Sequence, residues 1–161
     1  MTREQFTASV RAEQEGLRRF LLALCGGDGQ KADDIAQDAL VKAYLASDSY
    51  VPRVKFSSWL YRIAYNCFID GVRKRTLPTV DAETAQARET ASDERPDDVF
   101  RYQELYAAIG GLPQGERAAI LLFYMEDRPV KEISAILNVP QGTVRSQLSR
   151  GREHLRQTIK R

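Results

Sequence analysis

The sequence lacks the features that mark membrane and secreted proteins. No apolar run approaches the roughly 18 to 20 residues that a helix needs to span a bilayer. The N-terminal stretch MTREQFTASVRAEQEGLRRF carries too many charged side chains to form the apolar segment of a secretory signal. These two absences predict a protein without membrane insertion that stays in the cytoplasm.

The residues that most often hold metals or perform catalysis are also scarce. The chain has one histidine, His154, and two cysteines, Cys25 and Cys67, which lie far apart and outside any Cys-x-x-Cys pair. A zinc site made by this chain alone is therefore not expected, and the cysteines are interpreted as reduced packing residues. No glycine-rich phosphate loop follows a strand pattern, and helix capping explains the neighbouring carboxylates of Asp33 and Asp34. We expect a protein that is not an enzyme and that uses no metal, cofactor or small-molecule substrate.

Charge is plentiful but unevenly placed. The 161 residues are 43% hydrophobic and 29% charged, which is typical of one ordinary or two small globular domains, and the formal net charge is only +2. Residues 53–75 and 141–161 each carry a net charge of +5, whereas residues 81–98 carry a net charge of −5. The nearly neutral sum therefore hides two basic patches separated by an acidic segment.

This acidic segment divides the chain. Residues 76–98, TLPTVDAETAQARETASDERPDD, have few large apolar side chains, two prolines and many small or acidic residues, a composition that cannot bury enough surface to fold alone. We interpret them as a flexible linker between a domain of residues 1–75 and a domain of residues 99–161. Fully extended, such a linker could span about 70 Å, so two distant sites could be reached at the same time.

Everything outside the linker is predicted to be helical. Apolar residues recur at helical spacing in residues 4–24, before the stretch CGGDG, and in residues 56–75, where Ser57 or Ser58 is the expected N-terminal cap. A helix between these two is expected to begin at the acidic pair named above. Four more helices are predicted at residues 99–110, 114–125, 129–137 and 140–158. No segment shows the alternation of a strand, so the predicted fold class is all-α.

The stretch VKEISAILNVPQGTVRSQLSRGREHL, residues 130–155, has the pattern of a helix-turn-helix. Apolar residues fall where the two helices would share a core, Ser134 is small enough for a close helix crossing, and Asn138 can adopt the left-handed turn conformation. Pro140 suits the first turn of the second helix. The side chains expected to contact base edges and phosphates are Gln141, Thr143, Arg145, Ser146, Ser149 and Arg150. The alternative is a solvated basic helix packed in a small bundle. That alternative does not explain why core spacing, a turn residue and a polar outer face occur together.

The stretch FSSWLYRIAYNCFIDGVRKR, residues 56–75, combines aromatic and basic residues on one helix. Arg62, Asn66 and Asp70 recur every four residues, Tyr61 and Tyr65 stand beside them, and VRKR closes the helix with positive charge. Such a face suits a single nucleic-acid strand, because unpaired bases stack on aromatic rings and phosphates pair with arginines. The alternative is that the aromatic residues of this helix belong to its core.

Three segments together carry a family resemblance. DDIAQDALVKAYLA, FSSWLYRIAYNCFIDGVRKR and LPQGERAAILLFYMEDRPVKEISAILNVPQGTVRSQLSRGREHLR resemble, in order and spacing, the extracytoplasmic-function (ECF) sigma factors, the small class of bacterial RNA polymerase specificity subunits. The resemblance covers nearly the whole chain except the linker. It implies two small helical domains: a sigma region 2-like bundle of three or four helices, and a sigma region 4-like helix-turn-helix domain. The implied function is an initiation factor that binds core RNA polymerase and directs it to a restricted set of promoters.

The resemblance also implies three binding surfaces. The polar face of residues 141–150 would bind the minus-thirty-five element of the promoter. The side chains expected at the melted minus-ten strand are Arg62, Tyr65, Asn66, Asp70 and Arg73. Those expected to bind core polymerase are Asp34, Gln37, Asp38 and Lys42. Gln147 and Ser149 differ from the residues common at these places in the family, which leaves the promoter sequence open.

The expected partners follow from the same resemblance. They are core RNA polymerase, promoter DNA as duplex and as melted strand, and an anti-sigma factor that could hold the protein at the membrane. Two competing hypotheses remain. One is a free-standing helix-turn-helix regulator whose N-terminal helices dimerise or sense a ligand. The other is a sigma-like decoy that binds polymerase without reading promoters.

Overall fold

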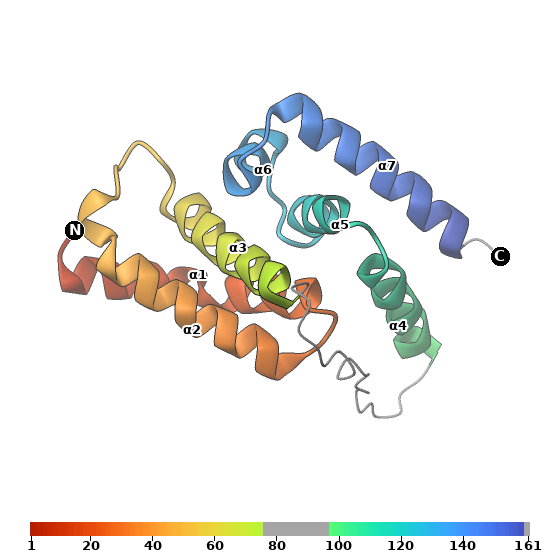
Figure 1. Cartoon of the computed structure of the whole chain (residues 1–161), viewed down its shortest axis with the longest axis horizontal. Helices are drawn as coiled ribbons and strands as arrows, with labels where there is room; N and C mark the ends of the chain where they lie inside the picture. Colours follow the sequence, from red (N-terminus) through yellow and green to blue (C-terminus); the bar gives the residue numbers. More distant parts are fainter. Residues whose placement is uncertain (76–96, 160–161) are drawn as a thin grey trace.

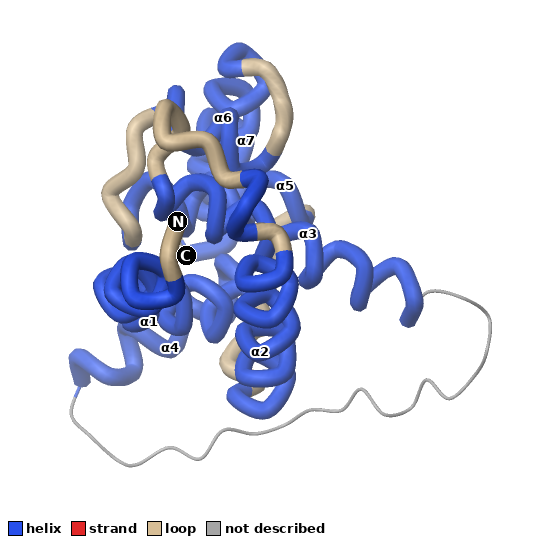
Figure 2. Tube along the Cα trace, turned by 90° about the vertical axis from the view of Figure 1, so that its left-hand side faces the viewer, coloured by secondary structure: helices blue, strands red, loops and turns tan. Residues whose placement is uncertain are grey.

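The structure, a computed structural model, describes residues 1–75 and 97–159, and most of these residues are helical. No strand occurs in these two ranges (Figure 2), and the expected all-α class is confirmed. Most of the expected linker lies outside the described residues. The helices before the gap form an N-terminal unit, residues 1–75, and those after it a C-terminal unit, residues 97–159.

Helix α1 (Arg3–Leu24) is set by strong signals at both ends. Thr2 and Gln5 form a capping box, in which the Thr2 hydroxyl accepts from the Gln5 amide at 3.0 Å and the Gln5 side chain accepts from the Thr2 amide at 2.8 Å. The helix ends where Gly26 and Gly27 adopt positive φ angles of 68° and 92°. Residues with a Cβ rarely adopt this conformation, so the predicted stop at CGGDG is confirmed.

Helix α2 (Gly29–Leu45) begins earlier than its acidic pair suggested. Asp28 is the N-cap, and its carboxylate accepts from the Lys31 amide at 3.1 Å. Asp33 and Asp34 therefore lie inside the helix, and the prediction that they cap it was wrong. Asp33 instead pairs with Arg18 of α1 at 2.7 Å, an exposed contact between two neighbouring helices.

Helix α3 (Phe56–Arg75) completes the N-terminal unit and packs against α2 and α1 (Figure 1). A short 3-10 turn, η1 (Ser47–Ser49), and a loop connect α2 to it. The expected caps of α3 are misplaced, because Ser57 and Ser58 lie within the first turn and both are buried.

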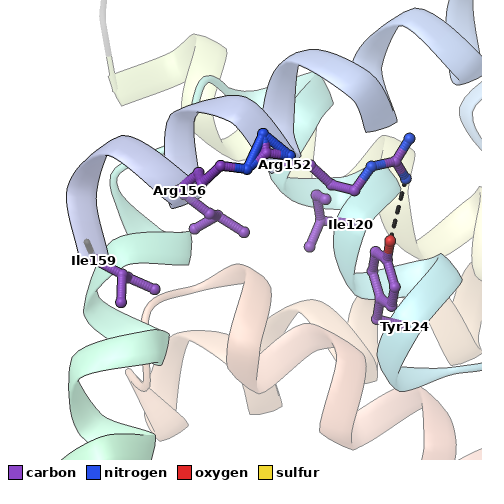
Figure 3. A pocket seen from close by; sticks show the side chains of 6 residues that line it. Ile120, Tyr124, Arg152, Arg156 and Ile159 are labelled. Atoms are coloured by element: carbon purple, nitrogen blue, oxygen red, sulfur yellow. Dashed lines mark hydrogen bonds between the residues drawn. The ribbon is translucent and has the colours of Figure 1, made fainter.

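The C-terminal unit contains four α-helices and one π-helical turn. They are α4 (Asp97–Gly110), α5 (Gln114–Ile120), η3 (Leu121–Met125), α6 (Val130–Leu137) and α7 (Gln141–Ile159). The single helix predicted over residues 114–125 is thus an α-helix that widens into a π-helix in its last five residues. In η3, Leu121 and Leu122 are buried, whereas Tyr124 is exposed and its hydroxyl accepts from Nη1 of Arg152 of α7 at 3.1 Å (Figure 3).

The two units share one hydrophobic core. Buried side chains of α1 and α3 belong to the same cluster as those of α5, η3, α6 and α7. Helix α3 packs against α6 (Figure 1), and α1 packs against η3 and α4. Although a long segment of the sequence separates them, the two units are in direct contact.

Candidate nucleic-acid and polymerase interfaces

Helices α6 and α7 form the helix-turn-helix that the sequence predicts. Asn138 has φ 59° and ψ 49°, the left-handed conformation expected of the turn residue. The Ser134 hydroxyl donates to the Val139 carbonyl across the turn at 2.5 Å. The Pro140 carbonyl accepts from the Val144 amide at 3.1 Å, so α7 starts directly after the proline. The shared core consists of Ile133, Ile136, Leu137, Val144 and Leu148, all buried.

The outer face of α7 is available to a ligand. Of the six side chains expected to meet the minus-thirty-five element, Thr143 is half-buried and the other five are exposed: Gln141, Arg145, Ser146, Ser149 and Arg150. Val144 and Leu148, which alternate with them along the helix, point into the core. An exposed row of donors and arginines on a second helix is the arrangement that enters the major groove of DNA.

On α3, four of the five side chains expected at the melted strand are exposed: Arg62, Asn66, Asp70 and Arg73. Tyr65 is different, because only 5% of it is exposed and its ring stacks on Phe68 at 6.2 Å between ring centres. Burial raises the pKa of the Tyr65 phenol, an effect that a hydrogen bond with Gln114 of α5 opposes. In this arrangement Tyr65 cannot stack on a base, since it lies between the two units.

A groove between α2 and α3 brings together residues from two of the expected sets. Its rim carries Asp34, Asp38 and Lys42 of the expected polymerase surface, with Asp70 and Arg73 of the expected minus-ten surface. Ile35 and Cys67 contribute apolar atoms, and the cavity volume is about 420 Å³. Gln37 is exposed on α2 but does not line the groove. The lining of the groove thus combines charged side chains from two helices with a few apolar atoms.

The contact between the two units centres on Arg128, in the loop before α6. Its guanidinium carbon lies 4.6 Å from the centre of the Tyr61 ring, and Nη1 donates to the Ser57 hydroxyl at 2.7 Å. Glu13 and Glu132 place carboxylate oxygens 3.7 Å and 3.4 Å from its guanidinium nitrogens. Because only 12% of the Arg128 side chain is exposed, these contacts operate with little competition from water.

A second polar contact across the two units lies beside the first. Glu126, at the end of η3, accepts from Nε and Nη2 of Arg19 at 2.9 Å and 3.0 Å, and from the Tyr61 hydroxyl at 3.3 Å. Burial, together with the nearby Glu126 carboxylate, raises the pKa of Tyr61, so this phenol stays protonated. Gly16 provides the space, since a Cβ atom there would lie 2.6 Å from the Tyr61 oxygen.

Two more residues complete the contact. Nη1 of Arg117 donates to the Leu24 carbonyl at the end of α1 at 2.9 Å. Lys55, before α3, pairs with Glu132 of α6 at 2.7 Å. The residues that join the units were not identified from the sequence: Arg19, Lys55, Arg117, Glu126 and Arg128. The sequence marks them only as ordinary charged residues.

Two family models match the chain. The model described as Sigma-70 region 2 matches residues 10–77, and the model described as Sigma-70, region 4 matches residues 102–155. The ECF RNA polymerase sigma factor SigW of Bacillus subtilis is 38% identical over 146 residues, which cover 83% of this chain and 78% of SigW. The ECF sigma-E factor of Escherichia coli is 34% identical over 74% of this chain and 69% of its own length. The chain belongs to the ECF RNA polymerase sigma factors.

Solved structures show the same fold for this sigma factor. The sigma factor RpoE of Bartonella quintana, in a co-crystal structure with the anti-sigma factor NepR, is 26% identical with a TM-score of 0.83 over 98% of this chain and 99% of that chain. CnrH, in complex with the cytosolic domain of CnrY, has a TM-score of 0.71 at 23% identity, over 96% of this chain and 86% of that chain. The agreement covers nearly the full length of this chain and therefore includes both units.

Membership in this family confirms the function expected from the resemblance. The chain is a promoter-specificity factor for the initiation of transcription by RNA polymerase. Sigma factors are not a class of catalytic enzymes. In the described part of the chain no group of histidine, cysteine and acidic side chains is arranged to hold a metal ion. None of the described helices is long and apolar enough to cross a membrane.

Proposed function

We propose that this sigma factor uses three separate surfaces for its three contacts in initiation. The α2 face with Asp34, Gln37, Asp38 and Lys42 binds core RNA polymerase. The exposed face of α3 binds the melted minus-ten strand, and the outer face of α7 binds the minus-thirty-five duplex. The domain boundaries proposed with these roles are residues 1–75 and 99–161. The observation that carries the proposal is the helix-turn-helix, whose core is closed while its row of polar and basic side chains stays exposed.

The minus-ten surface that we propose consists of Arg62, Asn66, Asp70 and Arg73, which are exposed on α3. Tyr65 joins them only if the two units separate, because it is buried with its phenol beside Gln114 and Arg117 of the C-terminal unit. Arginines on this face would neutralise phosphates, and the amide of Asn66 would bond the edge of an unpaired base. Binding is then expected to weaken steeply with salt.

Separation of the units is part of the proposed function. The two promoter elements lie about 25 base pairs apart, which is roughly 85 Å of duplex at 3.4 Å per step. Helices α3 and α6 are in direct contact in the structure. We call this placement, with the two units packed on each other, the closed arrangement. It cannot place both units on their promoter elements at once. We therefore propose that the closed arrangement belongs to the free factor and that the units part when it binds polymerase.

An anti-sigma factor is proposed as a further partner. The solved relative RpoE is bound to an anti-sigma factor, and its fold matches this chain with a TM-score of 0.83 over 98% of this chain. An inhibitor that binds the closed arrangement would keep both promoter surfaces from acting together. We also propose that this sigma factor works in the cytoplasm, without catalytic activity or cofactor, because its surfaces are built for binding.

The test is reconstituted transcription. Core polymerase with this factor is used to select promoters from genomic fragments, and run-off transcription is then measured on a selected promoter. Arg145→Ala is expected to reduce run-off more than tenfold while pull-down of core polymerase is unchanged. Lys131→Ala, at an exposed position on α6, is the matched control. If core polymerase is not recovered and no promoter-dependent transcript forms, the proposed function is wrong; if Arg145→Ala leaves transcription unchanged, the decoy hypothesis is favoured.

A further inference from the structure

A buried carboxylate on α5 contacts two successive turns of α7. Glu116, in the first turn of α5, is only 7% exposed. Its Oε1 lies 2.7 Å from Nδ1 of His154, and its Oε2 lies 3.6 Å from Nε of Arg150. Arg150 and His154 stand on successive turns of α7, so the two oxygens of one side chain contact two turns of the same helix.

The two helices pack closely at this point. Gly151, between the two contacts, is buried, and a Cβ atom there would lie 2.9 Å from Cγ1 of Ile120 and 3.6 Å from Cβ of Glu116. One turn earlier, Gln147 lies against α5, since a Cβ atom at Gly115 would be 2.4 Å from its Nε2. The position of Glu116 relative to α7 is therefore fixed by close packing on both sides of it.

The contact with Arg150 leaves most of that side chain in solvent. Arg150 is one of the side chains proposed to meet DNA, and 61% of its side chain is exposed. Glu116 approaches the guanidinium from its Nε side, so the two terminal nitrogens remain available for a base edge or a phosphate. An ion pair this exposed contributes little to stability. Its main physical effect is to restrict a long, flexible side chain to one direction.

We propose that Glu116 is a positioning residue for promoter recognition: it orients Arg150 toward the minus-thirty-five duplex before DNA is bound. This inference rests on the proposed function, because it assumes that α7 reads the duplex. Immobilising a flexible side chain opposes binding, and a side chain that is already oriented avoids part of this cost. Loss of the Glu116 charge is therefore expected to weaken binding to the minus-thirty-five element, although Glu116 itself does not contact DNA in this proposal.

The test is a double-mutant cycle on holoenzyme, measured as binding to a selected promoter. Glu116→Gln keeps the size of the side chain and removes its charge, and Glu153→Gln is the matched control on the exposed side of α7. We expect Glu116→Gln to weaken binding about two- to fivefold, with no further loss when it is added to Arg150→Ala. On a promoter with a scrambled minus-thirty-five element, the effect of Glu116→Gln should disappear.

Each contrary outcome overturns a different statement. If Glu116→Gln weakens promoter binding as much in the Arg150→Ala background as in the unmutated factor, Glu116 stabilises the fold and does not orient Arg150. The same follows if it weakens binding to the scrambled promoter as much as binding to the selected promoter. If Arg150→Ala has no effect while Arg145→Ala does, the positioning role fails and the proposed function stands. If neither arginine matters, the proposed minus-thirty-five surface fails as well.

A second measurement does not depend on how the variant folds. In the unmutated full-length protein, nitrogen relaxation of the arginine side chains reports the mobility of each Nε on the picosecond to nanosecond timescale. We expect the Arg150 Nε to be clearly more ordered than the Nε of Arg145, which is exposed on the same helix. Equal mobility of the two would overturn the positioning role.

Discussion

The guanidinium of Arg128 stacks over the ring of Tyr61, with 4.6 Å between the guanidinium carbon and the ring centre. Arg128 belongs to the C-terminal unit and Tyr61 to α3 of the N-terminal unit, and Tyr61 is fully buried. A cation over an aromatic face is stabilised most when water is excluded from both. This pair is therefore a principal contact of the closed arrangement.

Arg128→Met is predicted to weaken that arrangement. The substitution keeps an apolar contact with Tyr61 but leaves Glu13 and Ser57 without their guanidinium partner. We expect the free energy of unfolding to fall by about 2 kcal/mol, measured by urea unfolding of the full chain. Lys131→Ala, at an exposed site on α6, should change it by less than about 0.5 kcal/mol. An unchanged urea midpoint for Arg128→Met would show that the contact is energetically unimportant.

Two glycines provide a matched pair of variants. Gly16→Ala places a methyl group 2.6 Å from the Tyr61 oxygen and 3.0 Å from Glu126 Oε1, whereas a Cβ at Gly71 meets nothing within 4 Å. Both glycines lie inside helices, where alanine gains roughly 1 kcal/mol of helix propensity. We expect Gly71→Ala to raise the melting temperature and Gly16→Ala to lower it, because Tyr61 is buried and cannot move away freely. If both variants were stabilised alike, Gly16 would not be needed for the contact between the units.

The closed arrangement should also depend on pH through Glu132. Burial alone would raise the pKa of the Glu132 carboxyl, but Lys55 and Arg128 outweigh it and hold this pKa below its ordinary value of 4.5. A carboxylate with a depressed pKa stabilises the fold above its unfolded pKa, and this contribution is lost as the pH falls through the folded pKa. The stability difference between the unmutated protein and Glu132→Gln should thus be present at pH 6 and shrink below about pH 4. A stability difference that stays constant down to pH 3 would contradict a stabilising role for the ionised Glu132 carboxylate.

The groove between α2 and α3 predicts a variant that separates polymerase binding from folding. Asp38→Lys reverses a charge on its exposed rim. We expect affinity for core polymerase to fall at least tenfold, since like charges would then face each other in the proposed complex. The circular dichroism spectrum should not change. Glu104→Lys, an equal charge reversal on exposed α4, is the control; equal losses in both variants would mean that the effect is nonspecific.

The elements that the sequence predicted best are those with local signals. The stop after α1 depends on two glycines that adopt positive φ angles, and the turn before α7 depends on the left-handed Asn138. Both signals act within a few residues, so they can be seen without knowledge of the tertiary structure. The start of α2 was misjudged because three aspartates stand close together and only Asp28 has the extended conformation of a cap.

The contact between the units could not have been predicted in the same way. Arg19 and Glu126 lie 107 positions apart, and each is an ordinary charged residue within its own helical pattern. Tyr65 shows the same limit, because helical spacing places it near the arginines of α3 while its phenol is buried beside Gln114 and Arg117 of the C-terminal unit. Which face of a helix becomes buried depends on elements that are distant in the sequence.

The most direct test is the distance between the two units in the free factor and in holoenzyme. Spin labels are attached at Ala12 of α1 and Ala135 of α6, both exposed, in a chain whose two native cysteines have been replaced and whose transcription activity is retained. We predict a short distance with a narrow distribution in the free protein, and an increase of several tens of ångströms when the labelled factor binds core polymerase and promoter DNA. The same short distance in an actively transcribing holoenzyme would contradict a factor whose units separate to reach two promoter elements.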